Sequence, residues 1–148
     1  MSNELKIIYS QAAPVDELAI FDLLNELDGD RSSFDISRFY VAKAHNNLIG
    51  CVRTKIISED CWELASLAVH KNYQGRGIGS RLVEDLLLKE TKRPIFILTE
   101  LDKEGFYKKF NFHIIGPLEL PNEFKKEYDK IISRPFAKNL KVIAMGVE

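Results

Sequence analysis

The chain has 148 residues, of which 45% are hydrophobic and 29% charged, and its formal net charge at pH 7 is -1. This length is typical of one domain with its own core, and the balanced charge favours neither a nucleic-acid nor an anionic-membrane partner. No apolar run approaches the roughly 20 residues of a membrane-spanning helix, and the apolar stretch near the N-terminus is too short for a signal peptide. We therefore expect one cytoplasmic domain over residues 1–148.

Two cysteines, Cys51 and Cys61, fall in predicted strands. Neither has metal-ligand spacing to any of the three histidines, so we expect no bound metal. A disulfide across a hairpin is conceivable, but an intracellular chain would keep both thiols reduced. We interpret both cysteines as small buried hydrophobic residues.

The first part of the chain predicts a strand, a helix and an antiparallel meander. A short strand covers 6–9, and a helix begins at Pro14 and ends near Asp28. The apolar residues with helical spacing are Leu18, Phe21 with Ile20, Leu24 and Leu27. After a polar loop, three strands are expected at 39–44, 48–57 and 61–69, with a hairpin turn at 45–47 whose asparagines tolerate positive φ.

The stretch from Glu63 to Glu90 organises the rest of the chain. A nearly continuous apolar run through Val69 indicates a strand covered on both faces. A glycine-rich turn follows, and then a helix from about Gly77 to Lys89 or Glu90, with Leu82, Val83, Leu86 and Leu87 as its apolar stripe. Glycines at a helix start let N–H groups approach an anion, and the helix dipole favours phosphate there.

The later elements are predicted to alternate between strands and helices. A strand at 95–99 is expected to run parallel to Leu64–Val69, and a short helix extends from about Asp102 to Phe110. Asn111 is expected in the left-handed conformation that ends a helix. A strand at 112–115, a helix at 121–132 and a strand at 140–147 complete the chain. The fold class is therefore α/β with a mixed sheet, antiparallel first and parallel in the middle, and with helices on both faces.

Two common phosphate-binding motifs do not fit the glycine turn. A P-loop requires Gly-Lys-Ser/Thr at the helix start, which is absent. A dinucleotide fingerprint requires G-x-G-x-x-G, but the third slot after Gly75 and Gly77 is Ser80. The remaining interpretations are another phosphate ligand or a tight turn that binds nothing. Three glycines weaken a helix start by roughly 0.5–1 kcal/mol each, which favours a ligand.

The turn Gln74-Gly75-Arg76-Gly77-Ile78-Gly79 resembles the Q/R-x-x-G-x-G/A signature of the GNAT superfamily of acyl-CoA N-acyltransferases. The segment Gly105–Phe112 is similar to a second segment of that superfamily, and the resemblance covers about Tyr40 to Ile115. It implies the GNAT-like fold and an acetyl-CoA site, with the pyrophosphate on the backbone of Gln74, Gly75, Arg76, Gly77, Ile78, Gly79 and Ser80. It also implies that the pantetheine arm contacts the main chain of Leu67, Ala68 and Val69, where a strand N–H polarises the thioester carbonyl.

The implied reaction is attack of an amine on the thioester, which requires a base because an alkyl ammonium of pKa about 10.4 cannot attack. Glu63 is the first candidate, since the superfamily often places a glutamate there, and Glu100 is the second. Either carboxylate could instead be a solvated group at a strand end. Tyr107 matches the superfamily tyrosine that often protonates the departing thiolate, or it is a core aromatic residue. The superfamily often carries an Asn several residues earlier that contacts the cofactor, and this chain has none there.

The amine acceptor is left open by the sequence. Its pocket would be built by the first helix, the loop around Asp28–Ser37 and the segment near Pro117–Pro135, none of which is diagnostic. The leading hypothesis is an N-acetyltransferase for a small amine or amino acid. The alternatives are a protein N-terminal or lysine acetyltransferase and a non-catalytic acyl-CoA sensor. A monomer and a homodimer are both open, and Arg53 is interpreted as a surface residue or as a partner of a substrate carboxylate.

Overall fold

The computed structural model describes residues 5–134 and 141–148, so Pro135 and Leu140 of the predicted elements lie outside the described residues. The described chain forms two compact units. The first extends to Lys55 and includes Ala65–Thr91, and the second comprises Ile56–Leu64 and the chain from Lys92 onward. The single domain over 1–148 stays a prediction.

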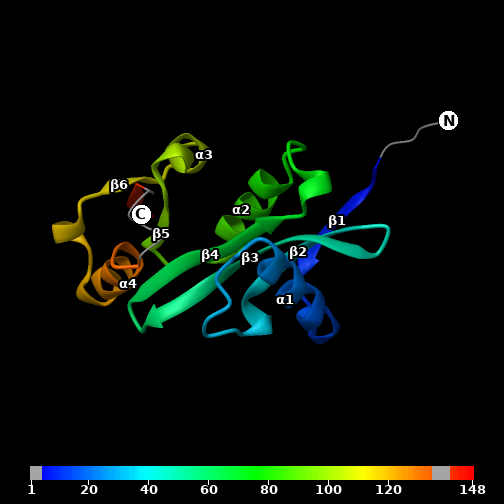
Figure 1. The fold of residues 1–148 in the computed structure, drawn as a ribbon, viewed down its shortest axis with the longest axis horizontal. Coiled ribbons are helices and arrows are strands. Elements are labelled where there is room, and N and C mark those ends of the chain that lie inside the picture. Colours follow the sequence, from blue (N-terminus) through cyan, green and yellow to red (C-terminus); the bar gives the residue numbers. More distant parts are fainter. Residues whose placement is uncertain (1–4, 135–140) are drawn as a thin grey trace. The chain divides into compact units, whose positions relative to one another are not determined.

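Seven strands are assigned to one mixed sheet, in the order β1-β2-β3-β4-β5-β7-β6 (Figure 1). Only β4 (Cys61–Val69) and β5 (Ile95–Glu100) are described as a parallel pair; the other described pairs are antiparallel. The predicted α/β class with a mixed sheet is confirmed. The predicted parallel pairing of the strand at 95–99 with the strand before the glycine turn is confirmed, and the paired residues are Trp62 with Ile95 and Glu63 with Phe96, just before the run Leu64–Val69.

The meander of the first unit begins with β1 (Ile7–Gln11), β2 (Phe39–Ala44) and β3 (Asn47–Ser58). Strand β2 pairs antiparallel with both neighbours. The turn between β2 and β3 has positive φ at His45 (52°) and Asn46 (65°), one residue earlier than the two asparagines suggest. Two positive-φ residues match the right-handed twist of a hairpin, which explains the tight connection.

Helix α1 (Glu17–Glu26) follows a 3-10 turn at Pro14–Asp16, and α2 (Ile78–Lys89) follows the glycine turn. Successive side chains of a strand point to opposite faces. Phe39 of β2 belongs to the core cluster that includes α1, whereas the ring of Tyr40 contacts Lys89 of α2. The two helices of the first unit therefore cover opposite faces. The cluster comprises Ile20, Leu23, Leu24, Phe39, Val41, Cys51 and Ala68.

The predicted apolar stripe of α1 is partly wrong. Leu18 is 72% exposed and Phe21 is 37% exposed, whereas Ile20, Leu23 and Leu24 are buried. The helix carries apolar residues on more than one face, so helical spacing alone admits two stripes. The stripe with Ile20, Leu23 and Leu24 is the buried one, because it packs on the strands.

Polar contacts of Asp16 stabilise the start of α1. The backbone N–H of Ala13 donates to Oδ2 of Asp16 at 2.8 Å, and Nζ of Lys43 lies 2.7 Å from Oδ1 of the same carboxylate. Burial alone would raise the pKa of Asp16, but the hydrogen bonds from Lys43 and Ala13 and the charge of Lys43 outweigh it and lower the pKa. This ion pair joins the start of α1 to β2.

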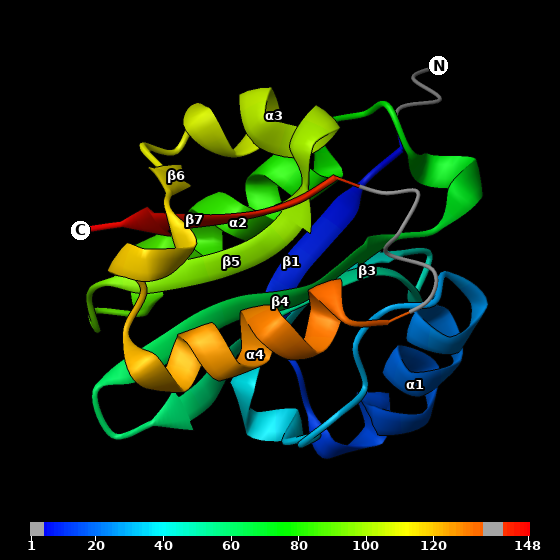
Figure 2. The same cartoon turned by 60° about the vertical axis from the view of Figure 1, so that its left-hand side comes forward.

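The second unit contains α3 (Glu104–Lys108), β6 (His113–Ile115), α4 (Asn122–Ile132) and β7 (Val142–Val147). Strand β7 lies between β5 and β6 and is antiparallel to both (Figure 2). The rings of Phe96 and Phe124 stack with centroids 5.1 Å apart and join β5 to α4. Asn111 has φ 70°, as predicted for the residue that ends the helical turn.

Both cysteines are buried and free, which confirms the interpretation as small hydrophobic residues. Burial raises the pKa of Cys51 to about 12. Burial, with nearby glutamates of which Glu123 has the largest effect, raises the pKa of Cys61 to about 11. No helix within 5–134 and 141–148 is both long and apolar enough to cross a membrane.

Candidate functional site

The glycine turn between β4 and α2 is held at its base by one side-chain and one backbone hydrogen bond. Nε2 of Gln74 donates to the carbonyl of Val69 at 2.9 Å, and the N–H of His70 donates to the carbonyl of Ile49 at 2.7 Å. Gly75 and Gly77 both have φ 79°, a conformation that strains any residue with a Cβ. A Cβ at either position would meet no atom within 4 Å. These glycines are therefore required by backbone conformation, and the space beside them is open.

The N-terminus of α2 has features that favour an anion. Gly77 occupies the N-cap position, no side chain caps the helix, and its first turn contains no acidic residue. The first N–H groups of a helix have no partner inside it, and the helix dipole places about half a positive charge there. Ile78 is buried against the sheet, whereas the turn residues Gln74–Gly77 are exposed. The predicted residues 74–80 thus lie together in the first unit as a turn and helix start with the conformation expected of an anion site.

Strand β4 is distorted just before the predicted thioester-contacting residues. Ser66 has φ 59°, which is unusual for a residue inside a strand and for any residue other than glycine. The residues that follow are Leu67 and Val69, which are partly exposed, and Ala68, which is buried. They lie in the same unit as the glycine turn. The chain therefore brings the two predicted cofactor-binding segments into one unit.

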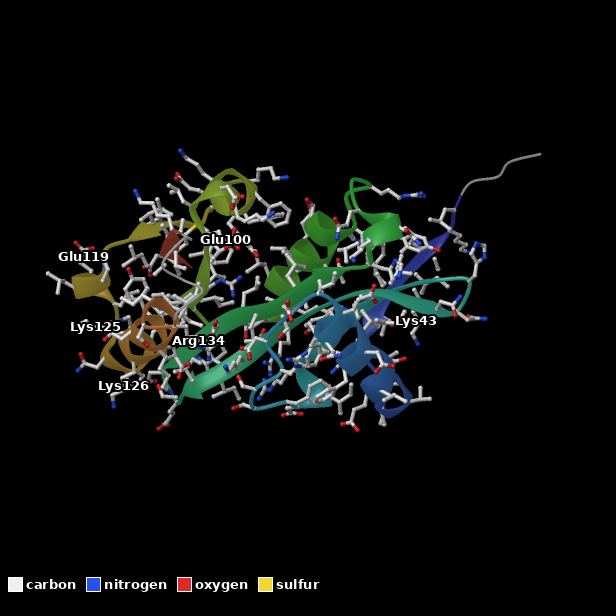
Figure 3. The ribbon with its side chains drawn as sticks, viewed as in Figure 1. Lys43, Glu100, Glu119, Lys125, Lys126 and Arg134 are labelled. Atoms are coloured by element: carbon white, nitrogen blue, oxygen red, sulfur yellow. The ribbon has the colours of Figure 1, made fainter. Side chains whose placement is uncertain are left out.

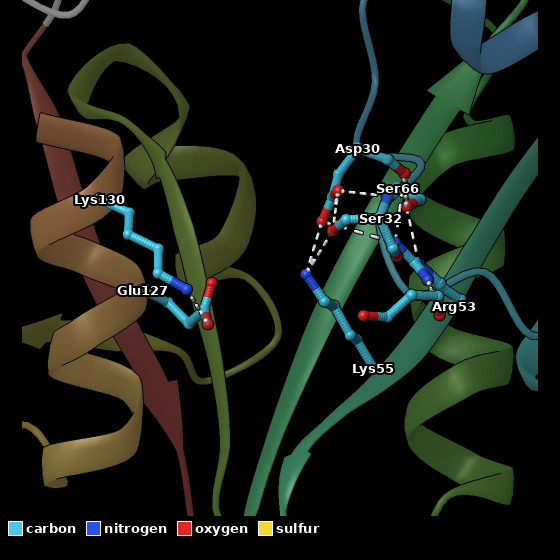
Figure 4. A network of polar contacts seen from close by, with 8 residues as sticks. Asp30, Ser32, Arg53, Lys55, Ser66, Glu127 and Lys130 are labelled. Atoms are coloured by element: carbon cyan, nitrogen blue, oxygen red, sulfur yellow. Dashed lines mark hydrogen bonds and ion pairs between the residues drawn. The ribbon is translucent and has the colours of Figure 1, made fainter. Parts of the chain in front are cut away.

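The interpretation of Arg53 as a surface residue is wrong, because its side chain is only 1% exposed. The described hydrogen bonds of its guanidinium reach four oxygen atoms, and Nη2 also lies 3.5 Å from Oδ2 of Asp30 (Figure 4). Nε donates to Oγ of Ser66 at 2.9 Å. Nη1 donates to the carbonyl of Ser33 at 3.0 Å, and Nη2 donates to the carbonyls of Ser32 at 2.8 Å and Asp30 at 3.3 Å. Five planar N–H groups suit this set of acceptors, which one ammonium could not reach together.

Two further contacts extend this network. Oγ of Ser66 donates to the carbonyl of Asp30 at 2.6 Å, and Nζ of Lys55 lies 3.1 Å from Oδ2 of Asp30. Burial alone would raise the pKa of Asp30, but hydrogen bonds from Ser32 and the charge of Lys55 outweigh it and lower the pKa. No sequence pattern predicts these partners. The one available signal was an arginine within the apolar stretch of β3.

Tyr107 lies in α3 of the second unit and is 8% exposed. Its ring makes edge contacts with Phe106 and Phe112, at centroid distances of 4.9 Å and 5.8 Å. Burial raises the pKa of its phenol to about 12. The side chain is thus both a packed aromatic residue and a phenol that stays protonated at every physiological pH.

The two candidate bases have different environments. Glu63 is the third residue of β4 and is buried, with 7% exposure, so the interpretation as a solvated strand-end carboxylate is wrong for it. Glu100 ends β5 and is exposed (Figure 3). Both carboxylates belong to the second unit, as does Tyr107. Among the described residues, no group of three or more His, Cys, Asp and Glu side chains could hold a metal ion.

Comparison with known families matches residues 35–114, more than half of the chain, to the family described as Acetyltransferase (GNAT) domain. The amino-acid acetyltransferase of Neisseria meningitidis serogroup A is 34% identical over 97 residues, which cover 63% of this chain and 22% of that protein. An uncharacterized N-acetyltransferase of Chlorobaculum tepidum is 31% identical over 96 residues, covering 63% of this chain and 55% of that protein. The chain thus spans about a fifth and about half of the lengths of these relatives.

A solved structure with a similar fold is the N-acetylglutamate synthase of Neisseria gonorrhoeae complexed with coenzyme A and L-arginine. Its TM-score is 0.71 and its sequence identity is 26%, over 97% of this chain and 34% of that chain. The family match covers the glycine turn, the distorted strand β4 and Tyr107.

Proposed function

The chain belongs to the GNAT acetyltransferase family, and from this premise we propose that it transfers the acetyl group of acetyl-CoA to the primary amine of an amino acid or another small molecule. Two similarities support this acceptor class. One relative is named an amino-acid acetyltransferase, and the neighbouring structure is an N-acetylglutamate synthase complexed with coenzyme A. Because this chain spans only part of both proteins, their substrates serve here as probes to be tested.

The observation that carries the proposal is the glycine turn before α2. Two glycines at φ 79° leave open space beside an uncapped helix N-terminus. Backbone N–H groups from this turn would hold the pyrophosphate of acetyl-CoA, helped by the helix dipole. The pantetheine arm would follow the main chain of Leu67, Ala68 and Val69, and one N–H of that strand would polarise the thioester carbonyl.

Amide formation joins the acceptor nitrogen to the acetyl carbon and breaks the carbon–sulfur bond. The amine must first lose a proton from its ammonium form, and Glu63 is proposed as the group that accepts it directly or through water. The nitrogen loses a second proton as the amide forms, and this proton passes to water or to the released thiolate. A base shielded from bulk water is easier to tune than an exposed one, so the burial of Glu63 favours it over Glu100. Glu100 remains the alternative.

The departing thiolate is proposed to accept a hydrogen bond from Tyr107. Because a free thiol has a pKa of about 8.5, a phenol with a pKa of about 12 stays protonated beside the thiolate. Complete proton transfer from Tyr107 is therefore uphill. Its main contribution would be stabilisation of the developing negative charge on sulfur.

The decisive test is calorimetric titration of acetyl-CoA into the parent protein and two variants of one glycine. Gly77→Ala and Gly77→Glu share the left-handed strain at φ 79°, but only glutamate adds negative charge and bulk to the pyrophosphate position. We expect micromolar binding in the parent, moderate weakening in Gly77→Ala and loss of binding in Gly77→Glu. A folded parent that binds no acetyl-CoA would contradict the proposal.

Thiol release then separates the functional alternatives. L-glutamate and the other amino acids are tested first, followed by peptides with free N-termini or lysines. Turnover with peptides alone would indicate a protein N-terminal or lysine acetyltransferase. Binding of acetyl-CoA without turnover of any amine would indicate a sensor.

A further inference from the structure

The loop after α1 is irregular yet tied to the sheet at one place. Between α1 and the next 3-10 turn, at Ile36–Arg38, the chain has no regular secondary structure, and Asp28 and Ser33 have positive φ. Gly29 at one end donates its N–H to the carbonyl of Leu24 at 2.8 Å. Phe34 at the other end packs against Phe21 and Phe39, with centroids 4.5 Å and 5.0 Å away. Residues 30–33 between these anchors contact the sheet through polar groups.

Arg53 is the centre of those polar contacts. Its guanidinium binds the backbone carbonyls of Asp30, Ser32 and Ser33, so it holds the path of the main chain whatever the loop side chains are. Burying a guanidinium is costly unless its N–H groups are paired, and apolar packing could close a loop at lower cost. A buried arginine that binds three carbonyls of one loop is therefore suited to fixing one conformation of residues 30–33 more than to adding stability.

Ser66 links this loop to the distorted strand. Its hydroxyl accepts from Nε of Arg53 and donates to the carbonyl of Asp30, so one side chain joins arginine, loop and β4. The strand side has other anchors, because Sγ of Cys51 donates to the carbonyl of Ser66 at 3.4 Å and His70 pairs with Ile49. Loss of the guanidinium should therefore release the loop while leaving the strand in place.

We propose that Arg53 is a positioning residue that fastens residues 30–33 to Ser66 and so presents this loop to the amine acceptor. The proposal rests on the proposed function for the identity of the ligand, and on the expectation from the sequence that the loop around Asp28–Ser37 lines the acceptor pocket. The hydrogen bonds that join Arg53 and Ser66 to residues 30–33 do not depend on the proposed function. Lys55 adds an outer contact, to the carboxylate of Asp30 and to Oγ of Ser32.

The test uses a graded set of variants with one control. Arg53→Met keeps much of the side-chain length and removes every donor, whereas Arg53→Lys keeps the charge but cannot reach all four acceptors. Ser66→Ala keeps the guanidinium and removes the hydroxyl that joins it to β4. This variant replaces Arg53→Met in the test if Arg53→Met does not fold. Lys43→Met is the control, because it removes a strand cation and its ion pair with buried Asp16 in the same unit, away from the loop.

Hydrogen exchange gives the first readout and needs no substrate. The N–H of Ser32 donates to Oδ1 of Asp30 at 2.9 Å, so its exchange reports whether the loop is ordered. In Arg53→Met this amide should exchange at least about tenfold faster than in the parent, while β3 and β4 keep their protection. Arg53→Lys and Ser66→Ala should show intermediate rates, and Lys43→Met should match the parent in this loop. Unchanged exchange of the Ser32 amide in Arg53→Met would overturn the proposal, whatever the activity of the protein.

Steady-state kinetics give the second readout, with the amino acid that the parent acetylates fastest. The acceptor KM should rise about tenfold or more in Arg53→Met, with kcat and the Kd of acetyl-CoA within about threefold of the parent, because only ground-state positioning of the acceptor is lost. Faster loop exchange with an unchanged acceptor KM would refute the positioning role. A parent that acetylates no amine would instead refute the proposed function and, with it, the acceptor-presenting role, while exchange would still decide whether Arg53 holds the loop.

Discussion

The phenol of Tyr107 has a pKa of about 12 in a site that is 8% exposed, so its proton is retained throughout the range in which the enzyme would work. Tyr107→Phe removes only the hydroxyl and keeps the edge contacts with Phe106 and Phe112. Loss of a proton or hydrogen-bond donor to the thiolate should lower kcat by about 10²-fold or more. The Kd of acetyl-CoA should stay within about threefold, because the pyrophosphate is held elsewhere. Tyr40→Phe is the matched control, and equal kcat in both variants would make Tyr107 a packing residue.

At Ser66 the backbone conformation can be separated from the hydroxyl. Ser66→Ala and Ser66→Gly both lose the hydrogen bonds to Arg53 and Asp30, but only glycine adopts φ 59° without a steric penalty. Glycine adds backbone entropy to the unfolded chain, which offsets part of that advantage. We expect Ser66→Gly to unfold at higher urea than Ser66→Ala, with a free energy of unfolding about 1 kcal/mol larger. A more stable alanine variant would mean that the left-handed conformation relaxes when the hydroxyl is removed.

At the level of elements, replacing either of two helix glycines by alanine should change the free energy of unfolding in opposite directions. Gly77 at the start of α2 has φ 79°, so Gly77→Ala should lower the free energy of unfolding by about 1–2 kcal/mol. Gly105 lies exposed inside α3, and a Cβ there would meet no atom within 4 Å. Gly105→Ala should therefore raise the free energy of unfolding by up to about 1 kcal/mol through helix propensity. Urea titrations measure both, and a shift of the same sign in the two variants would contradict this account.

Elements were predictable from sequence where the signal was local. The strand at Phe39–Ala44 was predicted with its observed bounds, and the left-handed Asn111 followed from the end of a helical turn. The stripe of α1 was not, because Leu18 and Ile20 both satisfy helical spacing and only the packed sheet distinguishes them. The parallel pairing across the helix crossover was predictable, but the paired residues were not, since a nearly continuous apolar run such as Leu64–Val69 does not indicate which of its residues pair with the next strand.

At the level of the whole molecule, the candidate site was predictable in the parts that are contiguous in sequence. The glycine turn combines several residues in one short motif, so its conformation could be read from the sequence. The network of Arg53, Ser66 and Asp30 joins three separate segments through backbone carbonyls, which have no sequence signature. The burial of Glu63 likewise could not be read from the sequence, which left open whether this carboxylate is solvated.

Stability of the whole molecule should form a plateau between about pH 4 and pH 9. Asp16, Asp30 and Asp35 have lowered pKa values in the folded state, against an ordinary 3.8, so the unfolded chain binds more protons in acid. Their contribution is present above pH 3.8 and is lost as the pH falls through the folded pKa values. Burial raises the pKa values of Cys51 and Cys61 from 9.0 and that of Tyr107 from 10.0. Their contribution is complete below pH 9 and is lost as the pH rises toward the folded values of about 11 to 12.

Urea midpoints measured from pH 2.5 to 11 would trace both limbs of this plateau, and two variants assign them. Asp16→Asn should flatten the acid limb, because the amide does not titrate, although it lowers the plateau by weakening the contact with Lys43. Cys61→Ala should flatten the alkaline limb, because it removes a thiol that must ionise on unfolding at high pH. The slopes are compared rather than the heights, since each substitution also changes packing. An alkaline limb of unchanged slope in Cys61→Ala would show that the buried thiol does not control stability there, and would leave Cys51 and Tyr107 as its source.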